Sequence, residues 1–405
     1  MAGRIIAFIA RMHIVPFFPE YMRLYDLNYA EAGVMLSVYF IAYGLALVPI
    51  GMAADRLSAR RLFAWGWIVT GAGIAGVALA PSYAWILVFR VMSGIGVAML
   101  YPPSLKLVSL TFSRQQRGKA IGLLEIGVGI GNLVSMTLYP LLAVWIAFTT
   151  LFLAAAVLCL PAGLLSFSLR DPERVAGTTT ATAAKPKAAG QEPTSEYQAP
   201  PRNRRGLWAE RRLWAFLGST LVLYFVMNGM LAWIPTYLEQ IGFDKSGAGL
   251  VMGIINTGQV LSSLPAGGIS DRIGRRTPVI HAGAVLLGAA PLGFLLAGTG
   301  QLPALALTLL AVLTGVGMGL GIAPSTTLAA ELYGTQRSGT VTSANAAVGQ
   351  LGSALSGALF GWIIDVTQSF VSIWVLCLAG LALRLLLIEL VGEPRARVAN
   401  RQAQV

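Results

Sequence analysis

The sequence carries little charge and few reactive side chains. Only 11% of its 405 residues are Asp, Glu, Lys or Arg, whereas about 25% is usual in soluble globular domains. The two cysteines, Cys159 and Cys377, both lie inside apolar runs, which predicts neither a disulfide framework nor a zinc site. With a mean hydropathy of +0.71, the composition excludes an ordinary soluble domain. It indicates a protein that crosses a membrane several times.

The basic residues do not predict a nucleic-acid-binding protein, although the formal net charge is +12. They are spread over short connections between long apolar runs and do not form one basic segment. Basic residues at the ends of apolar runs instead face the anionic lipid surface. The expected partners are therefore the lipid bilayer and a small solute, with no nucleic acid.

Twelve apolar runs are long enough to cross the bilayer as helices, which requires roughly 20 residues each. They are rich in Gly, Ala and Leu and lack the period-two alternation of strands, so an all-α membrane protein is expected and not a barrel. The expected spans are residues 3–22, 31–54, 61–80, 83–107, 118–142, 145–168, 213–238, 246–268, 277–298, 302–328, 339–364 and 370–391.

The placement of Lys and Arg predicts the orientation of these spans. With a cytoplasmic N-terminus, 24 of the 29 Lys and Arg residues fall on the cytoplasmic side, and only Arg23 and Lys245 fall outside. We therefore expect a multi-pass protein of the bacterial cytoplasmic (inner) membrane with both termini in the cytoplasm.

The first run, IIAFIARMHIVPFFPEY (5–21), contains Arg11 and His13 in its middle. These residues interrupt the apolar core and no small-residue cleavage site follows, so the run lacks the pattern of a cleavable signal peptide. It aligns with the seventh run, whose first residues have their counterparts before Met1. We expect a first span, and leave open whether the natural chain starts upstream.

Residues 169–212 are rich in Thr, Ala, Pro and charge and cannot bury enough apolar surface to fold alone. They are predicted to be a flexible cytoplasmic linker between a six-helix bundle at 1–168 and a second at 213–405, which ends in a short tail. The bundles repeat each other: FPEYMRLYDLNYAEAG (18–33) matches IPTYLEQIGFDKSGAG (234–249). Both start on the same side, so the repeat axis follows the membrane normal, and a substrate site is expected between the halves.

The connections after the second and eighth spans share the patterns GMAADRLSARR (51–61) and GGISDRIGRR (267–276). They resemble the loop motif of the major facilitator superfamily, and RVMSGIG (90–96) resembles its fourth-span motif. By this resemblance, which covers nearly the whole chain, the sequence is identified as a member of that superfamily. The resemblance implies twelve helices in two pseudo-symmetric bundles, alternating access, and loops that close the cytoplasmic side. The gating residues it implies are Gly51, Asp55, Arg56, Arg60, Gly267, Asp271, Arg272 and Arg275.

Glycine-rich runs such as GIGVAM (94–99) and GVGIGN (127–132) do not predict nucleotide loops, because no strand precedes them and no Lys-Ser/Thr pair follows. No cofactor, metal site or enzymatic activity is therefore expected. The second run partly resembles the family's antiporter motif, but Asn132 stands in the place of its proline. That difference makes drug–proton antiport less expected, without excluding it.

Of the ionisable residues in the expected spans of the first half, four matter most: Arg11, His13, Arg90 and Glu125. A charge near the bilayer centre costs about 2.5–3.5 kcal/mol on insertion scales, so each needs a partner or a cavity. Arg11 and Glu125 lie at a similar depth, about 12 Å from the inner boundary. We expect Arg11 and Arg90 to bind substrate and Glu125, with His13, to couple protons. The alternatives are a permanent Arg11–Glu125 pair, a structural Arg90 and a neutral buried His13.

The second half offers uncharged polar groups instead, from which we expect hydrogen bonds to the substrate. These are Tyr224, Asn228, Asn256, Gln259, Asn345 and Gln350. Arg384 and Glu389, in the last span, are expected to reach the surface or to pair locally, because that span is peripheral in the family.

We predict a secondary active transporter that moves a small organic anion by proton-coupled alternating access and works as a monomer. Two buried arginines against one buried acid favour the anion. Two alternatives stay open. One is proton-driven efflux of amphipathic compounds, and the other is a transporter-like receptor or assembly protein that moves no solute.

Overall fold

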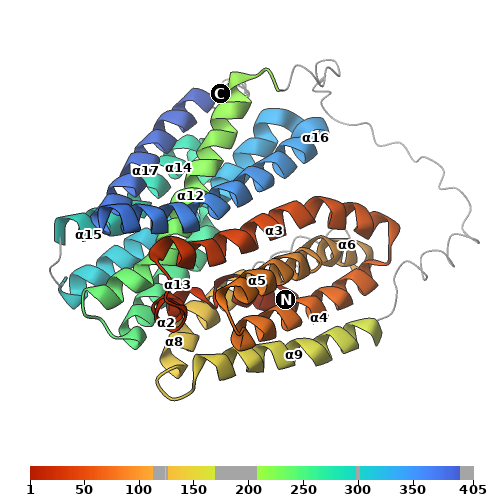
Figure 1. The fold of residues 1–405 in the computed structure, drawn as a ribbon. Helices are drawn as coiled ribbons and strands as arrows, with labels where there is room; N and C mark the ends of the chain where they lie inside the picture. The colour runs from red at the N-terminus through yellow and green to blue at the C-terminus, as the bar shows by residue number, and fades with distance from the viewer. Residues whose placement is uncertain (113–123, 125, 169–207, 298–301, 393–405) are drawn as a thin grey trace, which may run out of the picture.

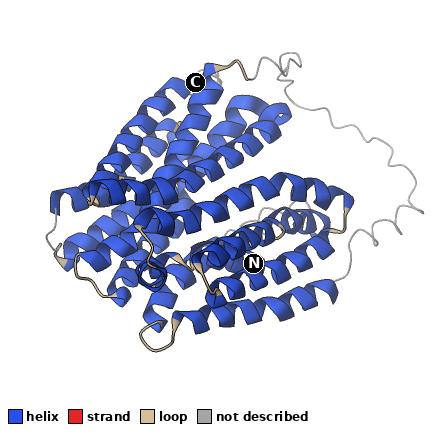
Figure 2. Ribbon diagram, in the orientation of Figure 1, coloured by secondary structure: helices blue, strands red, loops and turns tan. Residues whose placement is uncertain are grey.

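The structure is a computed structural model, and it describes residues 1–112, 124, 126–168, 208–297 and 302–392. Within these residues every regular element is helical, and Figure 2 shows no strand among them. Eleven helical segments are long and apolar enough to cross a membrane, and a shorter apolar helix spans Ile126–Leu142. The predicted all-helical membrane fold is thereby confirmed.

In the described part of the first half, several helical elements join to make one span (Figure 1). The elements are α1 (Ala2–Met12), η1 (Val15–Phe17), α2 (Phe18–Tyr25), α3 (Tyr29–Arg56), α4 (Ala59–Leu79), α5 (Tyr83–Ala98), α6 (Tyr101–Thr111), η2 (Val134–Leu138), α8 (Tyr139–Leu142) and α9 (Phe148–Ser168).

The second half has fewer and longer elements. They are α12 (Arg211–Gln240), α13 (Lys245–Ile273), α14 (Thr277–Leu287), α15 (Ala289–Ala297), α16 (Ala304–Thr367) and α17 (Val371–Val391). Helix α16 carries two spans, Ala304–Ile322 and Val341–Thr367, so the tenth and eleventh predicted spans are joined by helical backbone and not by a loop.

The first span departs from the single helix that its hydropathy predicts. It is broken between α1 and α2, where η1 contains Pro16 and α2 has Pro19 in its first turn. Proline has no N–H to donate, so it interrupts the ladder of main-chain hydrogen bonds. The fifth span contains a π-helical turn, η2, which no sequence pattern indicated.

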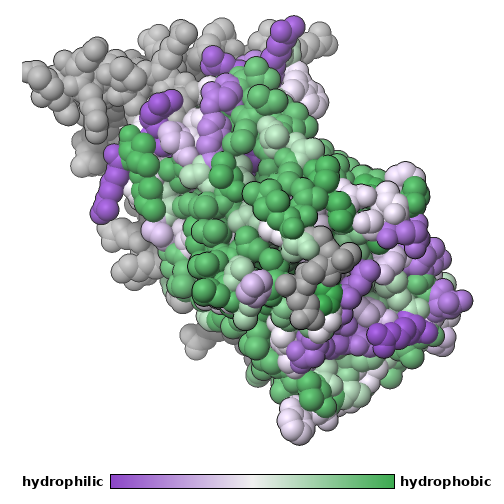
Figure 3. All heavy atoms as spheres, turned by 90° about the vertical axis from the view of Figure 1, so that its left-hand side faces the viewer, coloured by the Kyte–Doolittle hydropathy of each residue, from purple (hydrophilic) through white to green (hydrophobic). Residues whose placement is uncertain are grey.

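The start of α1 and the α3–α4 and α13–α14 connections lie at one end of the molecule, which we call the inner face. The opposite end is the outer face. Figure 1 shows α3 and α16 close together at the left and diverging toward the right. Figure 3 shows apolar side chains across the middle of one side of the molecule, with hydrophilic side chains gathered toward two opposite edges. A bilayer would cover such a band.

At the outer face the two halves are joined by a carboxylate at a helix start. Asp365, near the end of α16, accepts hydrogen bonds from the backbone N–H groups of Tyr29 (3.0 Å) and Ala30 (2.7 Å) in α3. The first N–H groups of a helix have no partner inside the helix and carry partial positive charge. The carboxylate therefore fixes α3 to the opposite half.

Close packing completes this outer contact. A Cβ atom at Gly33 would lie 2.0 Å from the carbonyl oxygen of Gly357, so α3 and α16 touch through their backbones. Trp233, fully buried, packs against Phe18 with 5.5 Å between ring centroids. An ion pair between Glu20 and Lys245 also crosses between the halves. We call these contacts, with that of Asp365, the outer seal.

Candidate functional site

The candidate site is centred on Arg11, in the last turn of α1 just before the break in the first span. Its guanidinium donates a hydrogen bond to the Oδ1 atom of Asn228 in α12 of the other half. It also lies over the rings of Phe40 and Phe8, at 4.6 and 5.2 Å from their centroids. Cation–π contacts of this kind are stabilising by about 0.5–2 kcal/mol.

Asn228 extends the contact into a short hydrogen-bond chain. Because arginine only donates, Oδ1 of Asn228 must face Arg11 and its Nδ2 group faces the other way. Nδ2 donates to the carbonyl of Tyr224 (3.0 Å) and to Oγ of Ser353 (2.9 Å), and Ser353 donates to the carbonyl of Gly349 (2.9 Å). Asn228 and Ser353 are both fully buried. The chain therefore joins α1, α12 and α16.

The charge of Arg11 has no carboxylate partner among the residues that the structure describes. Its Nε atom is buried without a hydrogen-bond partner there. The hydroxyl groups of Tyr39, Tyr43 and Tyr224 lie within electrostatic range of the guanidinium. The described surroundings of Arg11 are thus polar and aromatic, and none of these described groups is a carboxylate.

Arg90 lies next to this site but points into the first half. It is fully buried and donates to three main-chain carbonyls: those of Ala10 (2.7 Å), Arg11 (3.0 Å) and Met35 (2.9 Å). Because α1 ends at Met12, the carbonyls of Ala10 and Arg11 lack the donors of a continuing helix, and such groups must be satisfied inside a membrane. Arg90 supplies those donors.

His13 lies on the side of α1 that faces α9. Its ring packs edge-on against Phe152, with 4.4 Å between centroids. Its Nδ1 atom is 3.0 Å from the carbonyl of Ile9 and 3.1 Å from that of Ala10. Carbonyls only accept, so Nδ1 carries the proton. Nε2 is buried with no partner in the described part of the chain.

Of the other predicted substrate-binding residues, the structure brings only Tyr224 and Asn228 to Arg11. Asn256 donates to its own helix at Met252, and Asn345 accepts from Thr220 inside the second half. Gln350 packs against Gly44 of α3, at the contact between the halves. The Gln259 side chain is half-buried on α13. Glu125, the predicted proton carrier, lies outside the described residues.

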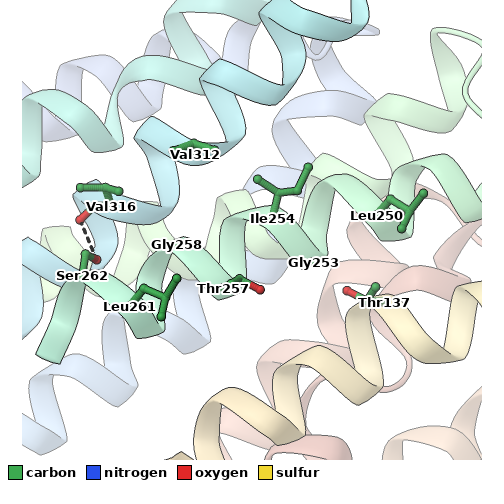
Figure 4. A pocket seen from close by; sticks show the side chains of 10 residues that line it. All are labelled: Thr137, Leu250, Gly253, Ile254, Thr257, Gly258, Leu261, Ser262, Val312 and Val316. Atoms are coloured by element: carbon green, nitrogen blue, oxygen red, sulfur yellow. Dashed lines mark hydrogen bonds between the residues drawn. The ribbon is translucent and has the colours of Figure 1, made fainter.

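A separate hollow lies away from Arg11, between α13, α16 and η2 (Figure 4). It has a volume of about 590 Å³ and is lined by Thr137, Leu250, Gly253, Ile254, Thr257, Gly258, Leu261, Ser262, Val312 and Val316. Leu250, Leu261 and Val312 are 53%, 64% and 40% exposed. These side chains make it an open apolar groove with no charged lining residue.

The predicted gating glycines make no close contact in this conformation. A Cβ atom at Gly51 or Gly267 would meet no described atom within 4 Å. Among the described residues, the close glycine contacts between α3 and α16 lie at the outer face, whereas both loop-motif glycines of the inner face have open space around them.

The structure describes the side chains of only some of the other predicted gating residues. The side chains of Asp55 and Arg56 lie outside its description. Arg60 is half-buried, and Arg272 and Arg275 are exposed.

Basic residues at the ends of the apolar runs were expected to face the lipid surface, and for Arg276 this expectation is wrong. Arg276 is only 4% exposed and holds a network at the end of α13. Its guanidinium bonds Asp271 at 2.5 Å, Glu331 of α16 at 2.9 Å and also Ser270. The hydrogen bond to Glu331 is the main cause that raises the pKa of Arg276 above its ordinary value. Glu331 lies 55 residues away in the sequence, and no motif indicated it.

Replacing Arg276 with glutamine is expected to lower the free energy of unfolding by about 1–2 kcal/mol, because buried charged hydrogen bonds are lost. The raised pKa keeps the arginine charged, so this contribution does not change from neutral to mildly alkaline pH and would be lost only as the pH rises through the raised pKa. Thermal unfolding in detergent from neutral to mildly alkaline pH measures it. Arg272→Gln, at an exposed site, is the control. Equal unfolding temperatures for both variants would contradict the network.

Comparisons with known proteins place this geometry in a family. The sequence model of the major facilitator superfamily matches residues 1–257 and 238–404. The chain belongs to the major facilitator superfamily, and it is a multi-pass membrane protein. In structure it is similar to a bacterial homologue of the human lysosomal transporter Spinster in an inward-facing, occupied conformation. That likeness has a TM-score of 0.73 and 16% identity and covers 96% of this chain and 94% of the other, which shows the shared fold.

Similar curated sequences include proteins that are named as probable transporters. A probable anion transporter of Oryza sativa subsp. japonica is 25% identical over 54% of this chain and 53% of its own length. A probable L-galactonate transporter of Escherichia coli (strain K12) is 25% identical over 63% of this chain and 58% of its own. The chain thus spans about half the length of the curated relatives that it matches.

Proposed function

We propose that this protein is a secondary transporter of a small organic anion. The observation that carries the proposal is Arg11, a cation in the middle of the first span that bonds Asn228 across the two halves and has no carboxylate partner in the described structure. The relatives named as transporters of an anion and of L-galactonate support the same class of substrate.

A bound anion would compensate the charge of Arg11 within the membrane. An unbalanced charge inside the membrane costs about 2.5–3.5 kcal/mol on insertion scales. A carboxylate or phosphate bound to the guanidinium removes that cost and forms charged, often paired hydrogen bonds. The binding site sits where both halves meet, so an anion held there contacts both and is sensitive to their relative movement.

Alternating access is the second part of the proposal. The outer seal is closed in this structure, while the inner loop motifs make no close glycine contact. We assign this state to the inward-facing step of the cycle. In the outward-facing step the outer seal opens and the inner loops close, with both termini in the cytoplasm and the protein acting as a monomer in the bacterial inner membrane.

Proton coupling is the third part, and we assign it to Glu125. The surroundings of His13, an aromatic ring and main-chain carbonyls of its own helix, support a role in holding the helix break. Similarly, the three carbonyls bound by Arg90 support a positioning role for it. Direct substrate binding then falls to Arg11, Asn228 and Tyr224.

One observation favours the alternative function, efflux of amphipathic compounds. The groove of Figure 4 is apolar and open between elements of both halves, and it offers room for the apolar part of such a compound. The two functions differ in the charge of the solute, so one panel of probes separates them.

The test is uptake by purified protein in proteoliposomes under an imposed pH gradient, with carboxylates, phosphates, sugars and cationic dyes. Asn228→Asp is the decisive variant, because it places a carboxylate beside Arg11 without changing the size of the side chain. We expect it to raise KM for the anion by about tenfold or more. Asn345→Asp, outside the Arg11 site, is the matched control. Transport of dyes alone would support efflux, and anion uptake unchanged by Asn228→Asp would refute the site.

A further inference from the structure

The groove of Figure 4 contains polar atoms that the proposed anion site does not use. Thr137, in the π-helical turn η2, is 9% exposed, and its Oγ1 atom is buried with no hydrogen-bond partner among the described residues. Ser135 of the same turn instead donates to the carbonyl of Gly131 at 2.9 Å, as hydroxyl groups in helices commonly do. Figure 4 shows the Thr137 hydroxyl directed toward that of Thr257 in α13. The Thr137 hydroxyl is therefore free to bond a molecule in the groove.

Asn256 of α13 provides a second polar atom of this kind. It is 2% exposed, and its Nδ2 group donates to the carbonyl of Met252 at 2.8 Å. Because a carbonyl only accepts, Oδ1 is the other end of the amide, and Oδ1 is buried with no partner in the described residues. Asn256 lines a smaller hollow of about 160 Å³. This hollow shares Thr257 and Leu261 with the groove, so the two adjoin.

Gly253 brings these polar atoms together across the two halves. A Cβ atom on Gly253 would lie 2.9 Å from Oγ1 of Thr137, so the hydroxyl lies against α13 with no side chain between them. Asn256 and Thr257 follow Gly253 by three and four residues, and such positions lie on one face of a helix. We call Thr137, Asn256 and Thr257 the polar patch. It joins η2 of the first half to α13 of the second.

The polar patch is surrounded by apolar side chains that face the bilayer. Leu250 and Leu261 of the groove are 53% and 64% exposed, and Ile126 and Leu133 of the smaller hollow are each 41% exposed. The described lining of both hollows contains no charged residue, so a charged group would be buried there without compensation. The groove volume of about 590 Å³ lies within the range of about 300–1,000 Å³ of sites that hold one drug-sized molecule. These properties fit an uncharged molecule that enters from the bilayer.

We propose that the groove binds an uncharged, single-chain amphiphile whose hydroxyl group bonds Thr137 and Asn256 and whose hydrocarbon chain lies against the leucines. A hydroxyl group donates and accepts at once, so it donates to Oδ1 of Asn256 and accepts from Thr137. The bound molecule contacts both halves and stabilises the state in which the outer seal is closed. It differs from the transported anion. Its effect on the transport cycle rests on the proposed alternating access, whereas its binding does not.

Binding is measured with radiolabelled probes and the purified protein in phospholipid nanodiscs. The probes share one chain and differ in the head group: dodecanol donates a hydrogen bond, dodecyl methyl ether does not, and dodecyltrimethylammonium is charged. We expect dodecanol to have a Kd about tenfold or more below that of the other two probes.

Two variants of similar side-chain shape test the polar patch. Thr137→Val and Asn256→Leu are each expected to raise the Kd of dodecanol by about tenfold and to leave that of the ether within about twofold. Thr308→Val is the matched control, because Thr308 is exposed on α16 and lines neither hollow. It is expected to bind dodecanol as the wild type does.

The effect on the outer seal is measured with a cysteine at Ser37, which is 5% exposed in the sealed state. At about ten times its Kd, dodecanol is expected to slow the reaction of this cysteine with an external water-soluble thiol reagent by about tenfold, because the bound state excludes the open one. Thr257→Phe, whose ring would occupy the place shared by both hollows, is expected to abolish both the binding and the slowing.

The outcomes separate this inference from the proposed function. Equal affinity for all three probes, or wild-type affinity in both Thr137→Val and Asn256→Leu, overturns the site. Binding that leaves the cysteine at Ser37 equally reactive overturns the stabilisation of the sealed state. A phospholipid that stays bound in native mass spectrometry and that dodecanol does not displace overturns the choice of ligand. If Thr257→Phe does not fold, the two variants of similar shape decide. Dodecanol binding with these preferences in a protein that takes up no anion would refute the proposed function and support this site.

Discussion

Arg11→Gln is expected to reduce anion uptake by about 100-fold or more. The variant removes a charge that lies between the halves and has no carboxylate partner among the described residues, and it leaves the Oδ1 atom of Asn228 buried without its donor. Loss of one partner from a buried charged hydrogen bond costs about 2–5 kcal/mol, and about 1.4 kcal/mol corresponds to tenfold. Initial rates in proteoliposomes, measured over a range of anion concentrations, give the change in kcat/KM.

Two further variants make the Arg11 result specific. Arg11→Lys keeps the charge but loses the planar pair of donors, and it is expected to retain part of the activity. Arg23→Gln changes an exposed arginine at the outer end of the same span and is expected to behave as the wild type. Full uptake by Arg11→Gln would show that the anion is bound elsewhere.

Gly33→Val is expected to abolish transport by keeping the outer seal open. A Cβ atom at Gly33 would lie 2.0 Å from the carbonyl oxygen of Gly357 and 2.5 Å from its carbon. Both are backbone atoms, so no side-chain rotation removes the clash. Overpacking of this kind costs about 1–3 kcal/mol and sometimes more, which shifts the equilibrium away from the sealed state by up to about 100-fold.

The opening of the outer seal is measured with a cysteine at Ser37. Its hydroxyl accepts from the backbone of Ala358 across the contact, and the residue is 5% exposed. In the Gly33→Val background this cysteine is expected to react rapidly with a water-soluble thiol reagent added outside. The native Cys159 and Cys377 are fully buried and provide little background. Gly268→Val, where a Cβ meets no described atom within 4 Å, is the control. A slow reaction in both variants would contradict the outer seal.

The spans could be predicted from the sequence because hydropathy is a local property. The predicted eleventh span, 339–364, and the observed Val341–Thr367 differ by only a few residues. Pro16 is visible in the sequence, but hydropathy alone does not show that this proline breaks the first span into two helices. The π-turn η2 in the fifth span has no sequence signature, since it depends on how that helix packs against α13.

The candidate site was predicted only in part, because its contacts join residues far apart in the chain. Arg11 and Asn228 were each conspicuous as polar groups in apolar spans, so both could be named. Asp365 and Ser353 were not, because an acid at a helix end and a serine among glycines are common in loops and packed helices. Arg384 was misassigned, since it is only 1% exposed and pairs with no described carboxylate. Its helix is peripheral, and sequence does not show which way a side chain points on such a helix.

The Arg11–Asn228 hydrogen bond also has a consequence for biosynthesis. Its partners are 217 residues apart, and chains emerge from the ribosome at about 5–20 residues per second. Arg11 is therefore made about 10–40 s before Asn228. In that interval only the rings of Phe8 and Phe40, both in the first half, are available to it among its observed contacts. The first span is thus completed by a residue of the seventh, and a nascent chain that ends before α12 contains Arg11 without its hydrogen-bond partner.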